Sequence, residues 1–316
     1  MMRNVVDLSL IKLKPAIKDY IWGGQRLVLE YNKQTELKRV AESWELSTHK
    51  DGESLVATGL NAGMKFSDYL AKNHGVLGDK VKTDNDCPIL IKLIDAKEKL
   101  SVQVHPDEKY ANQKHGQHGK TEMWHVLECN KGASLYYGFK DGVSKEEIEQ
   151  SIKNGTLTEL LNRVEVKKGD TFFINPGTVH AIGEGIVICE IQQNSNVTYR
   201  LYDYDRVGTD GRKRPLHISD ALAVLNTSPS IPHKNVSEGI LADCDLFRVE
   251  KIKVSAEYDL KINNYSFTAL LATEGSGSIC LNASSVEFMK GDCIFIPSQN
   301  ATAGIIGNCE IIKTTV

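Results

Sequence analysis

Two stretches of the sequence have the same pattern: GDTFFINPGTVH at residues 169–180 and GDCIFIPSQNAT at residues 291–302. Each begins with a Gly-Asp pair that is typical of a turn, continues through a short apolar run, and reaches a proline that ends the run. An apolar run of this length between turn residues predicts a buried strand. We therefore expect one supersecondary unit to occur twice, with His180 at the end of the first copy and Thr302 at the end of the second.

The rest of the chain is also rich in short strand-like runs, which lie at residues 42–47, 88–95, 134–138, 170–175 and 185–192. Helical periodicity is limited to residues 66–74, 144–163 and 219–225. The second of these helices opens with Ser144 and Glu147 in the spacing of a capping box. Many strands and few helices predict an all-β sandwich or barrel with helical decorations.

A change of composition divides the chain near residue 235. Residues 226–236, NTSPSIPHKNV, contain two prolines and few apolar side chains, which is typical of a linker. We expect a first domain of residues 1–235, which includes a small helical segment at about 144–164. The second domain, residues 236–316, reads as successive strands with Gly turns and no helix.

Composition excludes several classes of partner. The net charge is −3, without a block of Lys and Arg, so we expect neither nucleic acid nor a membrane surface as a partner. No apolar run reaches the roughly 18 residues that span a bilayer, and the N-terminus lacks the features of a signal peptide. The seven cysteines form no CxxC pair and are odd in number, so we expect reduced thiols in a cytoplasmic protein.

The run SVQVHPDEKY, residues 101–110, begins as a strand with polar residues at every second position. Side chains of a strand alternate between its two faces, so Ser101, Gln103 and His105 point the same way. A half-exposed antiparallel strand with its polar face in water would explain this pattern. A row of ligands that faces a metal would explain it equally well.

The motif at residues 169–180 favours the metal, because it resembles the second motif of the cupin superfamily, whose jelly rolls hold a metal inside a double-stranded β-helix. QVH at residues 103–105 and Glu122 in GKTEMWHVLE resemble a variant of the first cupin motif. The resemblance implies four metal ligands, Gln103, His105, Glu122 and His180. Imidazole and carboxylate ligands suit zinc, and two His with one carboxylate also serve Fe(II) oxygenases.

Six segments are similar to the type I phosphomannose isomerase family, in its short bacterial form: YIWGG (20–24), AESWELS (41–47), PILIKLIDAKEKLSVQVHPDEKYA (88–111), GKTEMWHVLE (119–128), INPGTVHAIG (174–183) and EIQQNSNVTYRLYDYDR (190–206). This resemblance implies two cupin-type jelly-roll domains and one zinc ion per chain. It also implies interconversion of mannose 6-phosphate and fructose 6-phosphate through an enediol(ate), with Arg200 in the active site. The second domain has Gln299 and Thr302 where a metal-binding cupin has Gly and His, so we expect it to bind no metal.

The reaction also needs a general base and a phosphate site. Glu190 lies ten residues before Arg200, where alternation along a strand would bring it near the metal, and a zinc-bound water is the alternative base. Lys92, Ser101 and Lys120 resemble family positions that bind the phosphate, although the two lysines would also fit as surface side chains. Arg206 is a further candidate for the phosphate.

Two other functions remain open from the sequence. An Fe(II)-dependent cupin oxygenase would use the two His and the carboxylate, but it leaves Gln103, Lys92, Lys120 and Arg200 without a role. A cupin that binds a sugar phosphate without catalysis would have kept the barrel and lost the isomerase activity. In each case the expected partner is a small molecule, and we expect a monomer rather than an obligate oligomer.

Overall fold

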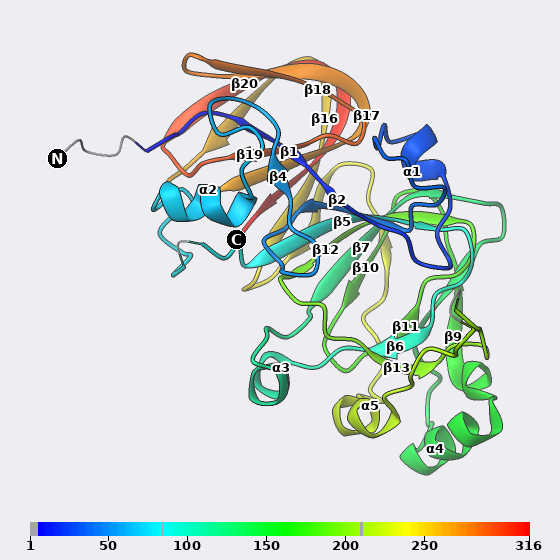
Figure 1. Ribbon diagram of the computed structural model, residues 1–316. Coiled ribbons are helices and arrows are strands. Elements are labelled where there is room, and N and C mark those ends of the chain that lie inside the picture. The colour runs from blue at the N-terminus through cyan, green and yellow to red at the C-terminus, as the bar shows by residue number, and fades with distance from the viewer. Residues whose placement is uncertain (1–5, 84, 209–210) are drawn as a thin grey trace.

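Three antiparallel sheets and a few short helices make up the computed structural model, which describes residues 6–83, 85–208 and 211–316 (Figure 1). The eight-stranded sheet has the order β15-β16-β20-β17-β19-β1-β4, and β18 pairs with β17. Its strands are β1 (Ile11–Lys14), β4 (Leu55–Val56), β15 (Gly239–Asp243), β16 (Arg248–Ile262), β17 (Thr268–Leu281), β18 (Ser284–Met289), β19 (Cys293–Ile296) and β20 (Ala301–Thr315). Because β1 and β4 come from the start of the chain, this sheet joins both ends of the sequence, and the domain boundary near residue 235 stays a prediction.

The other two sheets face each other in the first part of the chain. The seven-stranded sheet, in spatial order, contains β14 (Lys234–Asn235), β10 (Asp170–Ile174), β7 (Glu122–Cys129), β12 (Ile186–Gln193), β5 (Ile89–Ala96), β3 (Glu42–Leu46) and β2 (Ala16–Lys18). The five-stranded sheet contains β13 (Tyr199–Tyr202), β6 (Val102–Val104), β11 (His180–Ala181), β8 (Ser134–Phe139) and β9 (Leu161–Glu165). The predicted strands correspond to β3, β5, β8, β10 and β12, which confirms the mostly β fold.

The seven-stranded sheet is a middle layer, and this explains why β5 and β12 are buried along their whole length. Successive side chains of a strand point to opposite faces. Ile91 and Leu93 therefore pack in a core shared with Phe295 of the eight-stranded sheet. Lys92 and Ile94 point the other way, toward the five-stranded sheet, where Ile94 packs in a separate core. The face toward the five-stranded sheet thus carries Lys92 at a cavity, while Asp95 on the other face accepts a hydrogen bond from the amide of Arg26.

The helices lie at the periphery: α1 (Arg26–Leu29), α2 (Phe66–Lys72), α3 (Glu108–His115), α4 (Lys145–Asn154), the 3-10 turn η1 (Leu157–Leu160) and α5 (Ile218–Val224). Figure 1 shows α3, α4 and α5 beside the five-stranded sheet and α2 beside the eight-stranded sheet. No described residue after α5 is helical, as predicted for the second domain. The long apolar faces of the sheets therefore pack mainly against one another.

The helix predicted over residues 144–163 is too long. Its capping box of Ser144 and Glu147 is present, but the helix ends at Asn154 because Gly155 adopts a left-handed conformation with φ 71°. Residues beyond η1 form β9, which pairs with β8. The apolar side chains of Leu157 and Leu160 extend the apolar stripe of Ile148 and Ile152, so periodicity alone did not reveal the break.

Candidate active site

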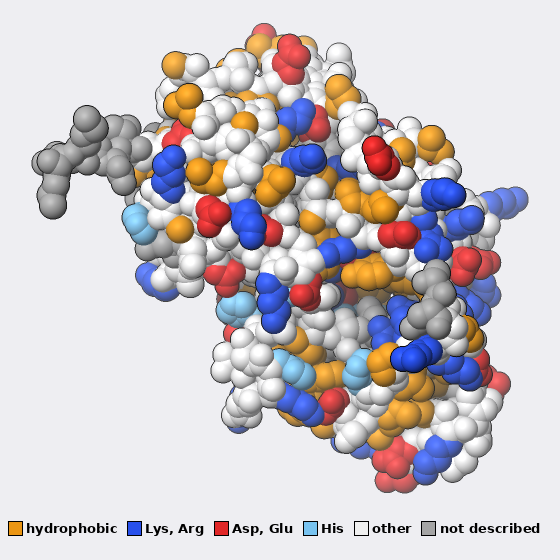
Figure 2. Space-filling model, in the orientation of Figure 1, with side chains coloured by type: hydrophobic (Ala, Val, Ile, Leu, Met, Phe, Trp, Pro, Cys, Tyr) orange, Lys and Arg blue, Asp and Glu red, His pale blue; other side chains and the backbone are white. Residues whose placement is uncertain are grey.

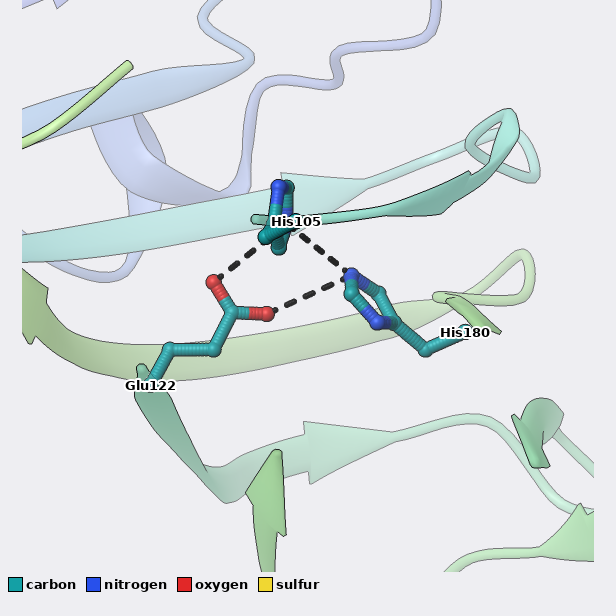
Figure 3. Close-up of side chains that lie close together, drawn as sticks. All are labelled: His105, Glu122 and His180. Atoms are coloured by element: carbon teal, nitrogen blue, oxygen red, sulfur yellow. Dashed lines mark hydrogen bonds and ion pairs between the residues drawn. The ribbon is translucent and has the colours of Figure 1, made fainter. Parts of the chain in front are cut away.

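Two histidines and one glutamate from separate segments meet between the seven-stranded and five-stranded sheets (Figure 3). Glu122 begins β7, His180 lies in β11, and His105 follows β6. All three side chains are buried. Their nitrogen and oxygen ligand atoms lie within 4.8 Å of one another, and no other such group of three occurs among the described residues.

The distances in this group match those that a small tetrahedral ion requires. The Nε2 atoms of His105 and His180 are 3.1 Å apart. Oε1 of Glu122 lies 3.3 Å from Nε2 of His180, and Oε2 of Glu122 lies 3.7 Å from Nε2 of His105. An ion with tetrahedral bonds of 2.0–2.2 Å holds its ligand atoms about 3.3–3.6 Å from one another. The three side chains are therefore spaced to share a zinc-sized ion.

The protonation of the histidines also fits a metal. Nδ1 of His105 lies 2.9 Å from the carbonyl oxygen of Val197, and Nδ1 of His180 lies 2.9 Å from that of Thr178. A carbonyl oxygen only accepts hydrogen bonds, so each Nδ1 carries the proton. Burial, with the nearby charge of Lys120, lowers the pKa of His180 to about 3 and that of His105 well below its usual value. Both rings are thus neutral, and each Nε2 presents a lone pair.

The carboxylate of Glu122 faces these lone pairs with an oxygen of its own. Its Oε1 is buried and has no hydrogen-bond partner, although Nε2 of His180 is near. Nζ of Lys120 lies 3.3 Å from Nε2 of His105, but Oε1 of Glu122 and Nε2 of His180 are two acceptors 3.3 Å apart, which repel unless a cation lies between them. The donor set, two neutral imidazoles and a carboxylate, therefore fits a divalent metal.

Gln103 lies beside this group, as the alternation in β6 predicts. Its Nε2 is 3.5 Å from Nε2 of His180, and its Oε1 is 3.5 Å from Oγ of Ser101. A half-turn of the terminal amide exchanges these two atoms and directs the oxygen toward the imidazoles. Gln103 can thus supply an oxygen ligand without a change of backbone.

A cavity of about 330 Å³ opens next to these side chains. Figure 2 shows Lys and Arg side chains around a hollow between the region of β2 and β5 and that of β6 and β13. Polar side chains dominate the lining, which includes most of the predicted catalytic and phosphate-binding residues: Lys92, Ser101, Lys120, Glu190 and Arg200, together with Gln103. The size suits a small polar ligand of the dimensions of a monosaccharide phosphate.

Two buried lysines and Glu190 form a charged row across the middle sheet. Lys92 and Glu190 are direct neighbours on β5 and β12, with 3.1 Å between Nζ and Oε1. Lys120 lies 3.8 Å from the same oxygen and donates a hydrogen bond to Glu122. Burial raises the pKa of Glu190, but the charges of Lys120 and Lys92 outweigh it and lower the pKa to about 2. The carboxylate therefore stays ionised.

Arg200 lies on the opposite wall, in line with the metal-binding group. Strand pairing places Arg200 next to Gln103, and Gln103 next to His180. The guanidinium donates to Oγ of Ser101 at 3.2 Å and to the carbonyl oxygen of Pro215 at 2.9 Å. It forms no ion pair with another described residue, so its charge is free to meet an anionic ligand.

The sequence did not reveal two charged residues of the cavity, Glu42 and Arg214. Glu42 accepts a hydrogen bond from Nε1 of Trp44 at 2.7 Å and lies 3.7 Å from Lys92. The alternation of Glu42 and Trp44 in β3 was the available signal. Arg214 comes from a polar loop without periodicity, so no pattern pointed to it.

Arg206, the further phosphate candidate, does not line this cavity. It is held by Asp203, which accepts hydrogen bonds from Arg206 and from Arg214. Arg214, eight residues later in the chain, occupies the place at the cavity wall that we considered for Arg206.

Comparisons with known proteins agree with this geometry. Residues 10–125 match the family model "Phosphomannose isomerase type I, catalytic domain", and residues 238–316 match "Mannose-6-phosphate isomerase, cupin domain". The mannose-6-phosphate isomerase ManA of Bacillus subtilis is 38% identical over 309 residues, which cover 95% of this chain and 96% of that protein.

Solved structures give the same result. The crystal structure of mannose 6-phosphate isomerase from Bacillus subtilis has a TM-score of 0.89 at 32% identity, and the match covers 98% of this chain and 100% of that one. A zinc-bound mannose 6-phosphate isomerase has a TM-score of 0.77 at 17% identity, over 97% of this chain and 99% of that one, which shows a shared fold. The chain belongs to the type I phosphomannose isomerase family.

Proposed function

We propose that this protein is a zinc-dependent aldose–ketose isomerase that interconverts mannose 6-phosphate and fructose 6-phosphate through an enediol(ate). Similarity to a mannose-6-phosphate isomerase over 95% of the chain supports mannose 6-phosphate as the substrate. The observation that carries the proposal is the convergence of His105, His180 and Glu122 beside a polar cavity, whose lining includes Gln103 and an Arg200 that pairs with no carboxylate among the described residues. Such a site can both polarise a carbonyl and bind an anion.

Gln103, His105, Glu122 and His180 would hold one zinc ion per chain. The hydrogen bonds from Nδ1 of both histidines to backbone carbonyls fix the rings in the orientation that a metal needs. A bound zinc supplies a Lewis acid that stabilises negative charge on the sugar oxygens. Lys120 lies close enough to balance part of the charge of Glu122.

The chain's own residues account for the rest of the reaction. The aldose loses a proton from C2 and regains one at C1, and negative charge develops on the two oxygens between these steps. Arg200 is our candidate for stabilising that charge, because its guanidinium keeps donors without a carboxylate partner. Glu190 is our candidate for the general base, because its carboxylate is ionised and lines the cavity.

Lys92, Ser101 and Lys120 are the proposed contacts of the substrate phosphate. All three line the cavity, and Ser101 shares a hydrogen bond with Arg200. The lysines already face Glu190, so a phosphate there would share them with that carboxylate. Replacement of Ser101 by Ala would raise KM more than it lowers kcat if Ser101 binds the phosphate.

The test is isomerase turnover of mannose 6-phosphate, with fructose 6-phosphate detected by a coupled assay. The purified protein is measured as isolated, after chelation, and after zinc is added back. Activity that is lost with the chelator and restored by zinc would support both the reaction and the metal. A folded protein that binds zinc but gives no fructose 6-phosphate would contradict the proposal.

The remaining proposals concern the cellular compartment and the oligomeric state of the enzyme. All seven cysteines are free in the structure, which agrees with a reducing compartment such as the cytoplasm. Among the described residues, no helix is long and apolar enough to cross a membrane. We propose a monomer whose partner is the small-molecule substrate.

A further inference from the structure

A second cavity, of about 370 Å³, lies on the other side of Ile182 from the active-site cavity. Ile182 is buried and belongs to the lining of both. The second cavity is formed by the turn after β7, by β8 and β9, and by the segments around Lys99 and Tyr204. We call it the Arg163 groove. Its charged lining residues are Lys99, Lys131, Arg163 and Glu184.

The Arg163 groove carries an excess of positive charge that the protein itself does not neutralise. Lys99, Lys131 and Arg163 face one carboxylate, that of Glu184, which leaves a net charge of +2 in the lining. None of these four side chains forms an ion pair with another described residue. Elsewhere the surface cations are often paired, as Lys168 is with Glu128 and Glu274. Like charges gathered without partners repel, and a bound anion would relieve the repulsion.

Two of the groove's side chains are held in place by their neighbours. Nε of Arg163 donates to Oγ of Ser134 at 2.8 Å, which orients the guanidinium. Nζ of Lys99 lies 3.9 Å from the centre of the Tyr204 ring, and Arg206 donates to the carbonyl oxygen of Lys99. Ordered cations bind an anion with less loss of side-chain entropy than mobile ones do.

Tyr204 gives the groove an aromatic wall in an unusual conformation. Its backbone has a φ of 56°, a left-handed value that bulky residues rarely adopt. Its hydroxyl oxygen is buried and has no hydrogen-bond partner among the described residues. Such strain and an unsatisfied polar group persist where they serve a function more often than elsewhere.

We propose that the Arg163 groove is a second binding site, separate from the active site, for a small phosphate ester of the size of a monosaccharide phosphate. A phosphate monoester has a charge of about −1.5 to −2 at neutral pH, which matches the net charge of the lining. Arg163 provides a planar fork of donors for the phosphate oxygens, and the lysines provide point charges. Tyr204 and Tyr136 line the space left for the sugar.

Equilibrium dialysis of the zinc-loaded protein against labelled glucose 6-phosphate tests this proposal. The variant Lys131→Glu/Arg163→Glu reverses the charge of the groove, and Lys131→Glu alone replaces it should the double variant fold poorly. We expect either variant to bind glucose 6-phosphate in the groove at least about tenfold more weakly, because charged hydrogen bonds are lost, so fewer equivalents should bind at a ligand concentration near the Kd of the groove. Unphosphorylated glucose should show no such difference.

The matched control is Lys109→Glu/Lys153→Glu, which changes the net charge equally at exposed positions outside the groove. This control should keep the second equivalent. Equal loss in both double variants would show non-specific attraction by charge and overturn the proposal. The same number of equivalents in the natural protein and in the groove variant would also overturn it, whatever the isomerase assay gives.

Discussion

The two Gly-Asp units of the chain, at residues 169–180 and 291–302, form the same turn. Gly169 and Gly291 have φ values of 94° and 95°. Asp170 accepts a hydrogen bond from the amide of Lys167 at 2.8 Å, and Asp292 accepts one from the amide of Met289 at 2.9 Å. The turn and the strand after it are therefore one structural device used twice.

The two units differ in the residue at their C-terminal end. The first ends on His180, which is fully buried at the metal-binding group, whereas Thr302 is exposed in the second. The interior behind the second unit is packed with apolar side chains, including Leu270, Ile294 and Ile311, and the gap between these three has no room for a water molecule. The shared device thus fixes the backbone, and the inward-facing side chains decide between chemistry and stability.

The largest effect on turnover should come from replacing the residue that distinguishes the two units, His180 in the first and Thr302 in the second. His180→Ala removes one imidazole of the metal-binding group, and we expect turnover to fall at least about 10³-fold because several kcal/mol of charge stabilisation are lost. Zinc content, measured by mass spectrometry of metals, should fall with it. Thr302→Ala is the matched control and should change neither quantity. Full zinc content in active His180→Ala would remove this histidine from the site.

The next effect separates two carboxylates with similar partners. Glu190 faces Lys92 and Lys120, and Glu310, in the eight-stranded sheet, is 2.8 Å from Lys251 and 3.3 Å from Lys253. We expect Glu190→Gln to lower kcat about 10²-fold or more, since a general base is lost. Glu310→Gln should leave kcat unchanged. Exchange of the C2 hydrogen of the substrate with solvent measures the proton step directly, and normal exchange in Glu190→Gln would assign the base elsewhere.

The sequence predicted the mostly β fold from local patterns, whereas the metal-binding group was implied by the resemblance of several segments to known motifs. Alternation placed Gln103 and His105 on one side of the chain, and the motif around residues 169–180 supplied His180. Strand pairing then brings these residues together, since Gln103 lies directly opposite His180.

Other features depend on contacts that no local pattern records. Arg214 lies outside the six segments that resemble the family, and its hydrogen bonds to Asp203 hold it at the cavity. A glycine such as Gly155 can either end a helix or lie within one. Here the helix ends, because the residues that follow pair as β9 with β8. The contribution of β1 to the C-terminal sheet is likewise a long-range pairing.

A smaller effect tests the stabilising role of the second unit's interior. Ile305 is fully buried in the apolar core of the eight-stranded sheet. Ile305→Ala should lower the free energy of unfolding by about 2–5 kcal/mol, because it removes buried methylene groups and leaves a cavity. Urea denaturation measures the change. Zinc content and kcat of the folded protein should stay the same, and a parallel loss of zinc would mean that this core supports the metal site directly.

The smallest effect concerns pH, to which the two parts of the chain should respond differently because all nine histidines precede residue 235. The carboxylate of Asp86, 3.8 Å from Nε2, and that of Glu108, 2.9 Å from Nδ1, raise the pKa of His118 to about 9 although burial opposes the shift. The folded state therefore holds this proton more tightly than the unfolded state, whose pKa is about 6.5. Its contribution is complete below pH 6.5 and is lost as the pH rises through 9.

Because the His118 side chain is 45% exposed, solvent screens these pairs and the contribution should stay below about 1 kcal/mol. We expect His118→Gln to lower the urea midpoint at pH 6 and to leave it nearly unchanged at pH 10. His233→Gln is the control, as its ring stacks on Phe172 at 4.8 Å and has no carboxylate partner among the described residues. Added salt should shrink the effect of His118→Gln at pH 6. An equal loss of stability at both pH values would show that His118 contributes by packing rather than by its charge.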